Sequence, residues 1–208
     1  LHLLSRRQRQ MCIRDRSLMA LETAKVKKLV QGDEDYKAFE KLPALLKSVL
    51  DNNSYYEKVA DSIYQKESCF FIGRGIDYAI CMEGSLKLKE VSYLHSEAYQ
   101  AGELKHGTIS LVEENMPVLC VITNQALKDK SISNLKETEA RGAFGIVITT
   151  KDLDDFEDYT KIVVPTTSMF TQSMLVVPAL QLLSYYVALK RGCDIDKPRN
   201  LAKSVTVE

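Results

Sequence analysis

Short runs of apolar residues, each bounded by glycine, proline or polar residues, constrain the fold of this chain more than any other feature. Four runs have the character of strands: SCFFIG (68–73), VLCVIT (118–123), GIVIT (145–149) and KIVVP (161–165). None of them alternates polar with apolar residues, so each strand is expected to be covered on both faces. Uniformly apolar strands separated by helices predict an α/β fold, in which helices cover both faces of a parallel sheet.

Helical periodicity fills most of the sequence between and around these runs. Pro43 is expected near a helix start, where its missing N–H group costs nothing, and Gly142 is expected to end a helix. The helices predicted from periodicity cover residues 18–30, 37–50, about 53–65, 77–94, 125–141 and 171–192.

The last of these helices, residues 171–192, is apolar nearly all round and could be taken for a membrane span. Four polar side chains interrupt it, and its apolar portion is shorter than the ~20 residues that a bilayer requires. The favoured interpretation is a buried central helix, bent at Pro178. No membrane partner is expected.

Charge and cysteine content narrow the classes of function. Lys and Arg total 28, as do Asp and Glu, so no basic field indicates nucleic acid or a membrane surface as a partner. The five cysteines show no CxxC spacing, and three of them lie in or beside apolar runs. We therefore expect buried thiols in a reducing cytoplasm. No spacing of histidine, cysteine and aspartate suggests a metal site, and no cofactor is expected.

The first 16 residues are set apart from the rest. SRRQRQMCIRDR contains five arginines and no apolar periodicity that could dock it onto a core, and it lacks the continuous apolar stretch of a secretory signal. A basic interaction arm is one explanation, but the string resembles a translated sequencing-library adapter. We therefore expect residues 1–16 to be a non-native leader and the native sequence to begin near Ser17, within a longer protein.

The first strand is followed by Gly73-Arg74-Gly75 and then by a helix. Glycines at this position permit a tight turn, and the helix start offers free N–H groups to an anion. A plain strand-to-helix turn is an equally good interpretation of so short a motif. Ligands of parallel sheets bind at the carboxyl ends of the strands, so this turn would lie on the functional edge.

Three charged residues share one stripe of the following helix, because Glu83, Lys87 and Glu90 stand at i, i+4 and i+7. A surface Glu–Lys pair worth ~0.2–0.5 kcal/mol is the plain interpretation of this spacing. A carboxylate base, Glu90, with a lysine beside it is the functional one, and burial of the helix would favour it. An apolar stripe suggesting such burial consists of Ala79, Met82, Leu86 and Tyr93.

Two further candidates are a histidine and a lysine. His106 is expected in a loop after a helix end, where a histidine is more often incidental than catalytic, whereas His95 is expected within a helix in a structural role. Lys203 lies between small residues near the terminus. A desolvated amine there would be a nucleophile that forms Schiff bases with carbonyls, although a solvated charge is the commoner case.

Four segments, taken in order, closely resemble the glutamine–fructose-6-phosphate aminotransferase (isomerizing) family: GRGIDYAICMEGSLKLKE, HSEAYQAGELKHG, VPALQLLSYYVAL and, most specifically, DKPRNLAKSVTVE. The match runs from about residue 40 to the terminus. It implies the second sugar isomerase (SIS) half of the isomerase domain, with a flavodoxin-like parallel sheet. By this resemblance we expect linking helices from a truncated first half at 17–50, the second SIS domain at 51–192, and a docked tail carrying the catalytic lysine at 193–208.

The resemblance also implies roles for single residues. Lys203 would form a Schiff base with C2 of open-chain fructose 6-phosphate, and Glu90 would move the proton between C1 and C2. His106 would open the sugar ring in the site of a neighbouring subunit, which implies a homodimer. Lys87 would assist near the same atoms, and Ala202 would contact the substrate. The reaction so implied is cytoplasmic and converts fructose 6-phosphate and glutamine into glucosamine 6-phosphate and glutamate.

Parts of the family pattern are missing from this sequence. The glutaminase domain and most of the first SIS half, with its Ser/Thr-rich phosphate loop, are not found, so we expect the 208-residue chain to be inactive alone. One alternative is a noncatalytic SIS module that senses sugar phosphates. Another is a related sugar-phosphate deglycase or isomerase. Neither alternative has a reason to keep the tail that carries Lys203.

Overall fold

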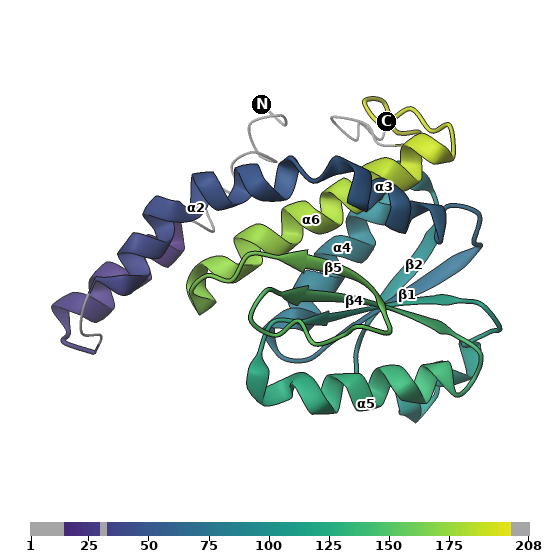
Figure 1. Cartoon of the computed structure of the whole chain (residues 1–208), viewed down its shortest axis with the longest axis horizontal. Helices are drawn as coiled ribbons and strands as arrows, with labels where there is room; N and C mark the ends of the chain where they lie inside the picture. The colour runs from purple at the N-terminus through teal and green to yellow at the C-terminus, as the bar shows by residue number, and fades with distance from the viewer. Residues whose placement is uncertain (1–14, 30–32, 201–208) are drawn as a thin grey trace, which may run out of the picture.

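The computed structural model describes residues 15–29 and 33–200, and a parallel β-sheet lies at the centre of this part of the chain (Figure 1). The strand order is β2-β1-β3-β4-β5, and all four neighbouring pairs are parallel. This is the flavodoxin-like order. The predicted parallel α/β fold is therefore confirmed. The strands are β1 (Ser68–Gly73), β2 (His95–Gln100), β3 (Pro117–Ile122), β4 (Phe144–Thr150) and β5 (Thr160–Val164).

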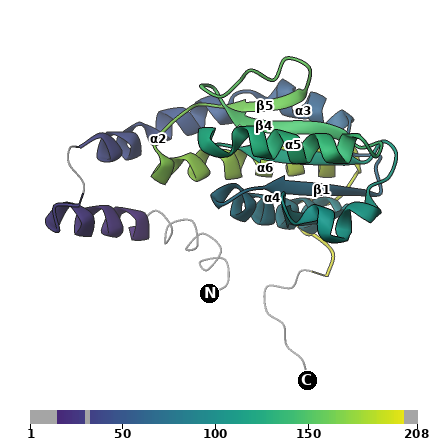
Figure 2. The ribbon, with the colours of Figure 1, turned by 90° about the horizontal axis from the view of Figure 1, so that it is seen from below.

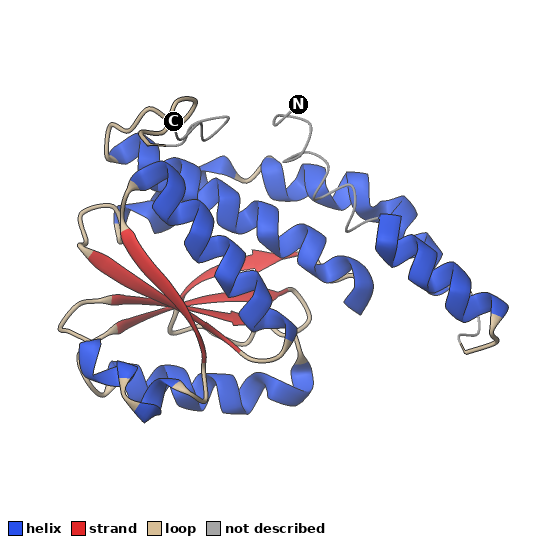
Figure 3. Ribbon diagram, turned by 180° about the vertical axis from the view of Figure 1, so that it is seen from behind, coloured by secondary structure: helices blue, strands red, loops and turns tan. Residues whose placement is uncertain are grey.

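Helices cover both faces of the sheet, but unequally (Figures 1 and 3). One face packs against α3, α4 and α6 around a large apolar core, and the other packs against α5 and the loops beside it. The short 3₁₀ helices are η1 (Leu104–His106), η2 (Thr108–Leu111) and η3 (Gln125–Leu127). The α-helices are α2 (Glu34–Leu50), α3 (Asn53–Asp61), α4 (Ile76–Ser92), α5 (Lys128–Glu139) and α6 (Met169–Lys190).

The N-terminal helices extend beyond the sheet (Figure 2). Residues 15–26 are helical, and α2 follows and packs against α6. The prediction that Pro43 lies near a helix start is wrong, because Pro43 lies inside α2. A proline there removes one backbone hydrogen bond and costs about 3 kcal/mol. Packing on both sides of it offsets that cost, since Leu42 and Val49 are both buried.

The four apolar runs are found as β1, β3, β4 and β5, with ends that differ from the predicted ones by no more than one residue. The strand β2 was not predicted. His95, expected within a helix, is instead the first residue of β2. His106, expected in a loop after a helix end, is instead the last residue of η1, which follows β2 after a short turn. The reason is that β2 is an edge strand whose side chains are mostly polar, so it lacks the apolar run that marked the other edge strand, β5.

Helix α6 is the central helix of the larger core. Its length and apolar composition would suit a membrane span, but half of its most apolar stretch is buried inside the protein. It packs closely on α4 at Gly84, where an added Cβ atom would lie 2.6 Å from Cδ1 of Leu180. The interpretation of this segment as a buried core helix is confirmed.

Candidate active site

The predicted stripe of charges on α4 forms a connected cluster. Nζ of Lys87 lies 2.8 Å from Oε2 of Glu90 and 3.7 Å from Oε1 of Glu83. The side chain of Glu90 is 17% exposed, that of Lys87 25% and that of Glu83 39%. The Lys87–Glu90 pair is therefore partly withdrawn from water, which strengthens the attraction between the two charges.

The apolar stripe that was expected to bury α4 is not the stripe that faces the sheet. Met82 and Leu86 are 47% and 39% exposed. The helix turns another side toward the sheet and α6, and the charged cluster lies along the boundary between this buried side and the exposed one. Periodicity alone could not decide the orientation, because α4 is apolar on two sides. The buried side consists of Asp77, Ile80, Cys81, Gly84, Ser85, Leu88 and Ser92.

The Gly73-Arg74-Gly75 turn and the charged cluster lie at opposite ends of α4. The helix starts at the carboxyl end of β1 and returns to the amino end of β2, so about 21 Å of helix separates its start from Glu90. The turn lies on the carboxyl edge of the sheet, as predicted. The cluster lies toward the amino edge, and the two do not form one site.

The carboxyl edge between β1 and β3 is occupied by a side chain of the protein itself. Asp77 is 1% exposed, and its carboxylate accepts hydrogen bonds from the backbone N–H of Thr123 at 3.0 Å and from its hydroxyl at 2.5 Å. Burial raises the pKa of Asp77, and the two bonds from Thr123 oppose that rise. A carboxylate in the first turn of α4 disfavours a second anion there, so the structure favours a plain turn over an anion site.

His106 is the last residue of η1, just beyond the carboxyl end of β2, and its side chain is exposed. The chain turns directly afterwards at Gly107, whose φ of 148° is a conformation that other residues rarely adopt. Strand β2 begins close to the end of α4 and spans about 20 Å over its six residues. Within one subunit, His106 and Glu90 therefore lie at opposite edges of the sheet.

The described part of the C-terminal segment, residues 193–200, returns to the end of α4. The backbone N–H of Arg199 donates to the Tyr93 hydroxyl at 2.7 Å, and its guanidinium group lies 4.2 Å from the centre of the Tyr93 ring. Tyr93 is three residues beyond Glu90. Lys203 and Ala202 lie outside the described residues. The sequence offered Tyr93 only as a member of an apolar stripe and gave no signal of this anchoring contact.

The three cysteines on β1, α4 and β3 are enclosed in the core of the protein. Cys69, Cys81 and Cys120 are buried free thiols, as predicted, and burial raises the pKa of each. Cys193 is partly exposed, and Cys12 lies outside the described residues. Among residues 15–29 and 33–200, no group of three histidine, cysteine or carboxylate side chains is arranged to hold a metal ion.

The parallel sheet, and α4 with its Glu–Lys pair, lie within the region of the chain that a family model matches. The model of the SIS domain family matches residues 62–191, and the chain belongs to this family. The fold and family expected from the four sequence segments are thereby confirmed.

Within that family, the chain is similar to glutamine–fructose-6-phosphate aminotransferases (isomerizing). It is 49% identical over 172 residues to that of Caldanaerobacter subterraneus subsp. tengcongensis, covering 81% of this chain and 28% of the relative. It is 44% identical over 193 residues to that of Halalkalibacterium halodurans, covering 92% of this chain and 32% of the relative. The chain thus spans roughly 30% of the length of these relatives.

A solved structure agrees with this similarity. The C-terminal domain of glucosamine-fructose-6-phosphate aminotransferase from Francisella tularensis has a TM-score of 0.71 and 38% sequence identity to this chain. The alignment covers 76% of this chain and 45% of that domain.

Proposed function

We propose that this chain supplies part of the isomerase site of an enzyme that converts fructose 6-phosphate and glutamine into glucosamine 6-phosphate and glutamate. The observation that carries the proposal is the partly buried Lys87–Glu90 pair, with the C-terminal segment anchored beside it at Tyr93. The similarity to the aminotransferases covers only this region of those enzymes. The remaining parts, a glutaminase region and a first SIS region, would be supplied by the rest of a longer protein.

Glu90 suits the role of the base. Its carboxylate lies 2.8 Å from the Lys87 ammonium group, and this ion pair holds the carboxylate in position at the end of α4. In the proposed reaction ammonia released from glutamine displaces Lys203 from C2 of the sugar and leaves an imine there. Glu90 then takes a proton from C1 of this open-chain imine, and a proton is returned at C2 to give the amino sugar. Lys87 stabilises the negative charge that the neighbouring sugar oxygen or the carboxylate carries during this transfer.

Lys203 suits the role of the nucleophile. Its neutral amine attacks the C2 carbonyl of open-chain fructose 6-phosphate, water leaves, and an imine links the sugar to the lysine. Lys203 is four residues beyond Arg199, and four residues of chain span at most about 14 Å. Because Arg199 is held at Tyr93, the amine is within reach of the end of α4. Ala202, its neighbour, would contact the substrate.

His106 requires a second subunit. We propose that it opens the sugar ring in the site of a neighbouring copy, since within one subunit it lies at the other edge of the sheet from Glu90. Imidazole exchanges protons near neutral pH, as ring opening demands. The functional form is then a homodimer of the longer protein, placed in the cytoplasm, where the buried thiols remain reduced.

Subunit mixing tests this arrangement. In the full-length enzyme, the variants Glu90→Gln and His106→Asn are each expected to be inactive. When the two are unfolded together and refolded, half of the dimers are mixed, and each mixed dimer has one site with both residues intact. About a quarter of the wild-type activity should return, as expected for a symmetric dimer with shared sites. If no activity returns although mixed dimers form, His106 does not act across the interface.

Covalent trapping tests the lysine. Borohydride should attach fructose 6-phosphate to Lys203 of the full-length enzyme, and a Lys203→Arg variant should not be labelled. Absence of any adduct in an active enzyme would exclude the Schiff base, and specific binding without an adduct or turnover would favour the noncatalytic sensing module. The 208-residue chain alone is expected to form no glucosamine 6-phosphate from glutamine or ammonia.

A further inference from the structure

The Gly73-Arg74-Gly75 turn has no part in the proposed isomerase chemistry, yet it contacts the segment that carries His106. Strands β1 and β2 pair in register, with Gly73 opposite Gln100, so the two strands end side by side at the carboxyl edge. The backbone N–H of Ala101 donates to the carbonyl oxygen of Gly73 at 2.9 Å, which continues the pairing just beyond β2. The turn after β1 and the turn after β2 are therefore joined where they begin.

The side chain of Arg74 contacts both α5 and the turn that follows β2. Its Nε and Nη2 atoms donate to Oδ1 of Asn134 at 3.2 and 2.9 Å, and Asn134 is 6% exposed. The same guanidinium group lies against Gly102, where an added Cβ atom would be 2.9 Å from Nη2 of Arg74. A side chain at residue 102 would therefore have to move the guanidinium group. The rigid fork of N–H groups lets one arginine hold the turn against a buried amide of α5.

The segment between β2 and His106 is short, and it is fixed from two sides. Leu104 is 1% exposed and packs into the smaller apolar core. The backbone N–H of His106 donates to the carbonyl oxygen of Glu103 at 3.0 Å, which closes η1. Because the His106 side chain itself is exposed, the position of its imidazole depends on the backbone of residues 101–106. Leu104 holds this backbone from the core, and Arg74 holds it near its start.

We propose that Arg74 is a positioning residue for His106, because it fixes the turn from which His106 reaches the site of the neighbouring subunit. This inference rests on the proposed role of His106 in ring opening. In this role Arg74 does not touch the sugar and acts only through the turn. A catalytic group that is misplaced by about 1 Å can lose roughly 10²-fold in rate. Loss of Arg74 should therefore impair ring opening and leave the later steps at Lys203 and Glu90 intact.

A substrate that needs no ring opening tests this proposal in the full-length enzyme. The sugar 5-deoxyfructose 6-phosphate lacks the hydroxyl group that closes the furanose ring, so it stays in the open-chain form. Arg74→Met should lower kcat/KM for fructose 6-phosphate about 10- to 100-fold, and that for the 5-deoxy sugar less than about threefold. Equal losses on both substrates, as a merely structural role would give, or no loss on fructose 6-phosphate, would overturn the proposal.

A second variant removes the partner of the guanidinium group. Asn134→Leu takes away the acceptor on α5 and should show the same selective loss on fructose 6-phosphate. The double variant should be no worse than Arg74→Met alone, because the two side chains act as a unit. Since Asn134→Leu leaves Arg74 in place, it decides the question even if Arg74→Met folds poorly. Wild-type activity of Asn134→Leu on fructose 6-phosphate would refute the contact as the means of positioning.

His106→Asn separates this inference from the proposed function on which it rests. This variant should also lose activity on fructose 6-phosphate selectively and keep activity on the 5-deoxy sugar. If His106→Asn loses both activities equally, or neither, the ring-opening role of His106 fails, and the positioning role of Arg74 fails with it. If His106→Asn shows the selective loss and Arg74→Met does not, only the role of Arg74 fails.

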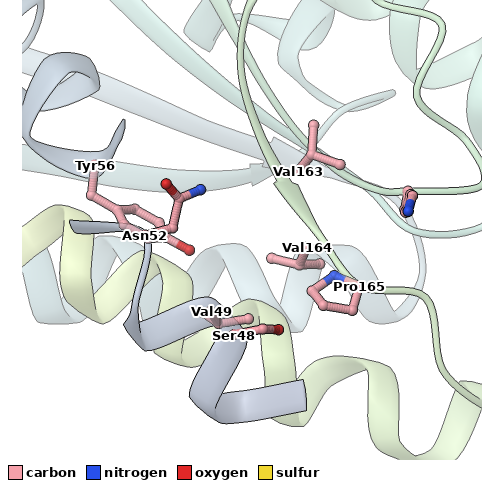
Figure 4. A pocket seen from close by; sticks show the side chains of 8 residues that line it. Ser48, Val49, Asn52, Tyr56, Val163, Val164 and Pro165 are labelled. Atoms are coloured by element: carbon pink, nitrogen blue, oxygen red, sulfur yellow. The ribbon is translucent and has the colours of Figure 1, made fainter. Parts of the chain in front are cut away.

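Hydrogen exchange measures the effect of Arg74 on the turn without catalysis. In the 208-residue chain, Arg74→Met should speed amide exchange of residues 101–106 about tenfold and leave that of β4 unchanged. Lys151→Met is the matched control, because it removes a cation from the same edge of the sheet. Lys151 is exposed there and lines a cavity of about 270 Å³ with Val164 and Pro165 (Figure 4). Unchanged exchange of residues 101–106 in Arg74→Met, or equal effects of the two variants, would refute the proposal.

Discussion

Replacing Asp77 with alanine should destabilise the protein by about 2–3 kcal/mol at neutral pH. The change leaves the backbone N–H and the hydroxyl of Thr123 without their acceptor, and bonds to a charged group contribute about 1.5–3 kcal/mol each. The burial that raises the pKa of Asp77 offsets part of this sum. For a chain of this size the melting temperature should then fall by about 4–12 °C.

Urea unfolding followed by circular dichroism measures this loss of stability. The same measurement on the Asp77→Asn variant at several pH values tests the role of the carboxyl proton. The folded protein holds the Asp77 proton more tightly than the unfolded chain does, since burial raises its pKa above 3.8. The stabilisation from that proton is complete below the unfolded value and is lost as pH rises through the folded pKa. The stability of the wild type relative to Asp77→Asn should therefore decrease from about pH 4 upward. Parallel pH profiles, or an Asp77→Ala variant as stable as the wild type, would refute this account.

Three further outcomes follow from packing and exposure. Leu180→Ala should cost about 2–5 kcal/mol in urea unfolding, because Leu180 is 1% exposed in the core where α6 meets α4; a loss below 1 kcal/mol would contradict that packing. Among the described cysteines, only Cys193 should react with a thiol reagent in the folded protein, and rapid labelling of a strand thiol would disprove their burial. Tyr93→Leu should speed tryptic cleavage after Arg199, whereas Tyr185→Leu, on an exposed tyrosine, should not.

The sequence predicted the central strands β1, β3 and β4 and the edge strand β5 almost to the residue, and it missed the edge strand β2. A strand covered on both faces consists mostly of apolar residues, so β1, β3 and β4 can be recognised in the sequence as apolar runs. Strand β2 has one neighbour in the described sheet and carries His95 and Glu97, so its composition resembles that of a loop or a helix. Its pairing with β1 depends on contacts between residues far apart in the sequence, which the local pattern of polar and apolar residues does not reveal.

The candidate site divides in the same way. The spacing of Glu83, Lys87 and Glu90 requires a shared helical stripe, and the ion pairs are found there. Which side of α4 faces the sheet depends on the packing of α6, which periodicity could not supply. His106 and Glu90 are separated because β2 runs from the amino edge of the sheet to its carboxyl edge. Since β2 was not predicted, the sequence could not show that these two residues lie at opposite edges.

The polarity of the outer strands also matters for how the chain behaves in a crowded solution. An unpaired strand edge presents free N–H and C=O groups that can template the aggregation of neighbouring molecules. Here the edge strand β2 carries Glu97, and the edge strand β5 carries Lys161, whose Nζ lies 2.7 Å from Oδ1 of Asp154. A strand of another molecule that paired with β2 or β5 would have to bury one of these charges. Both edge strands therefore disfavour the growth of fibres by strand addition.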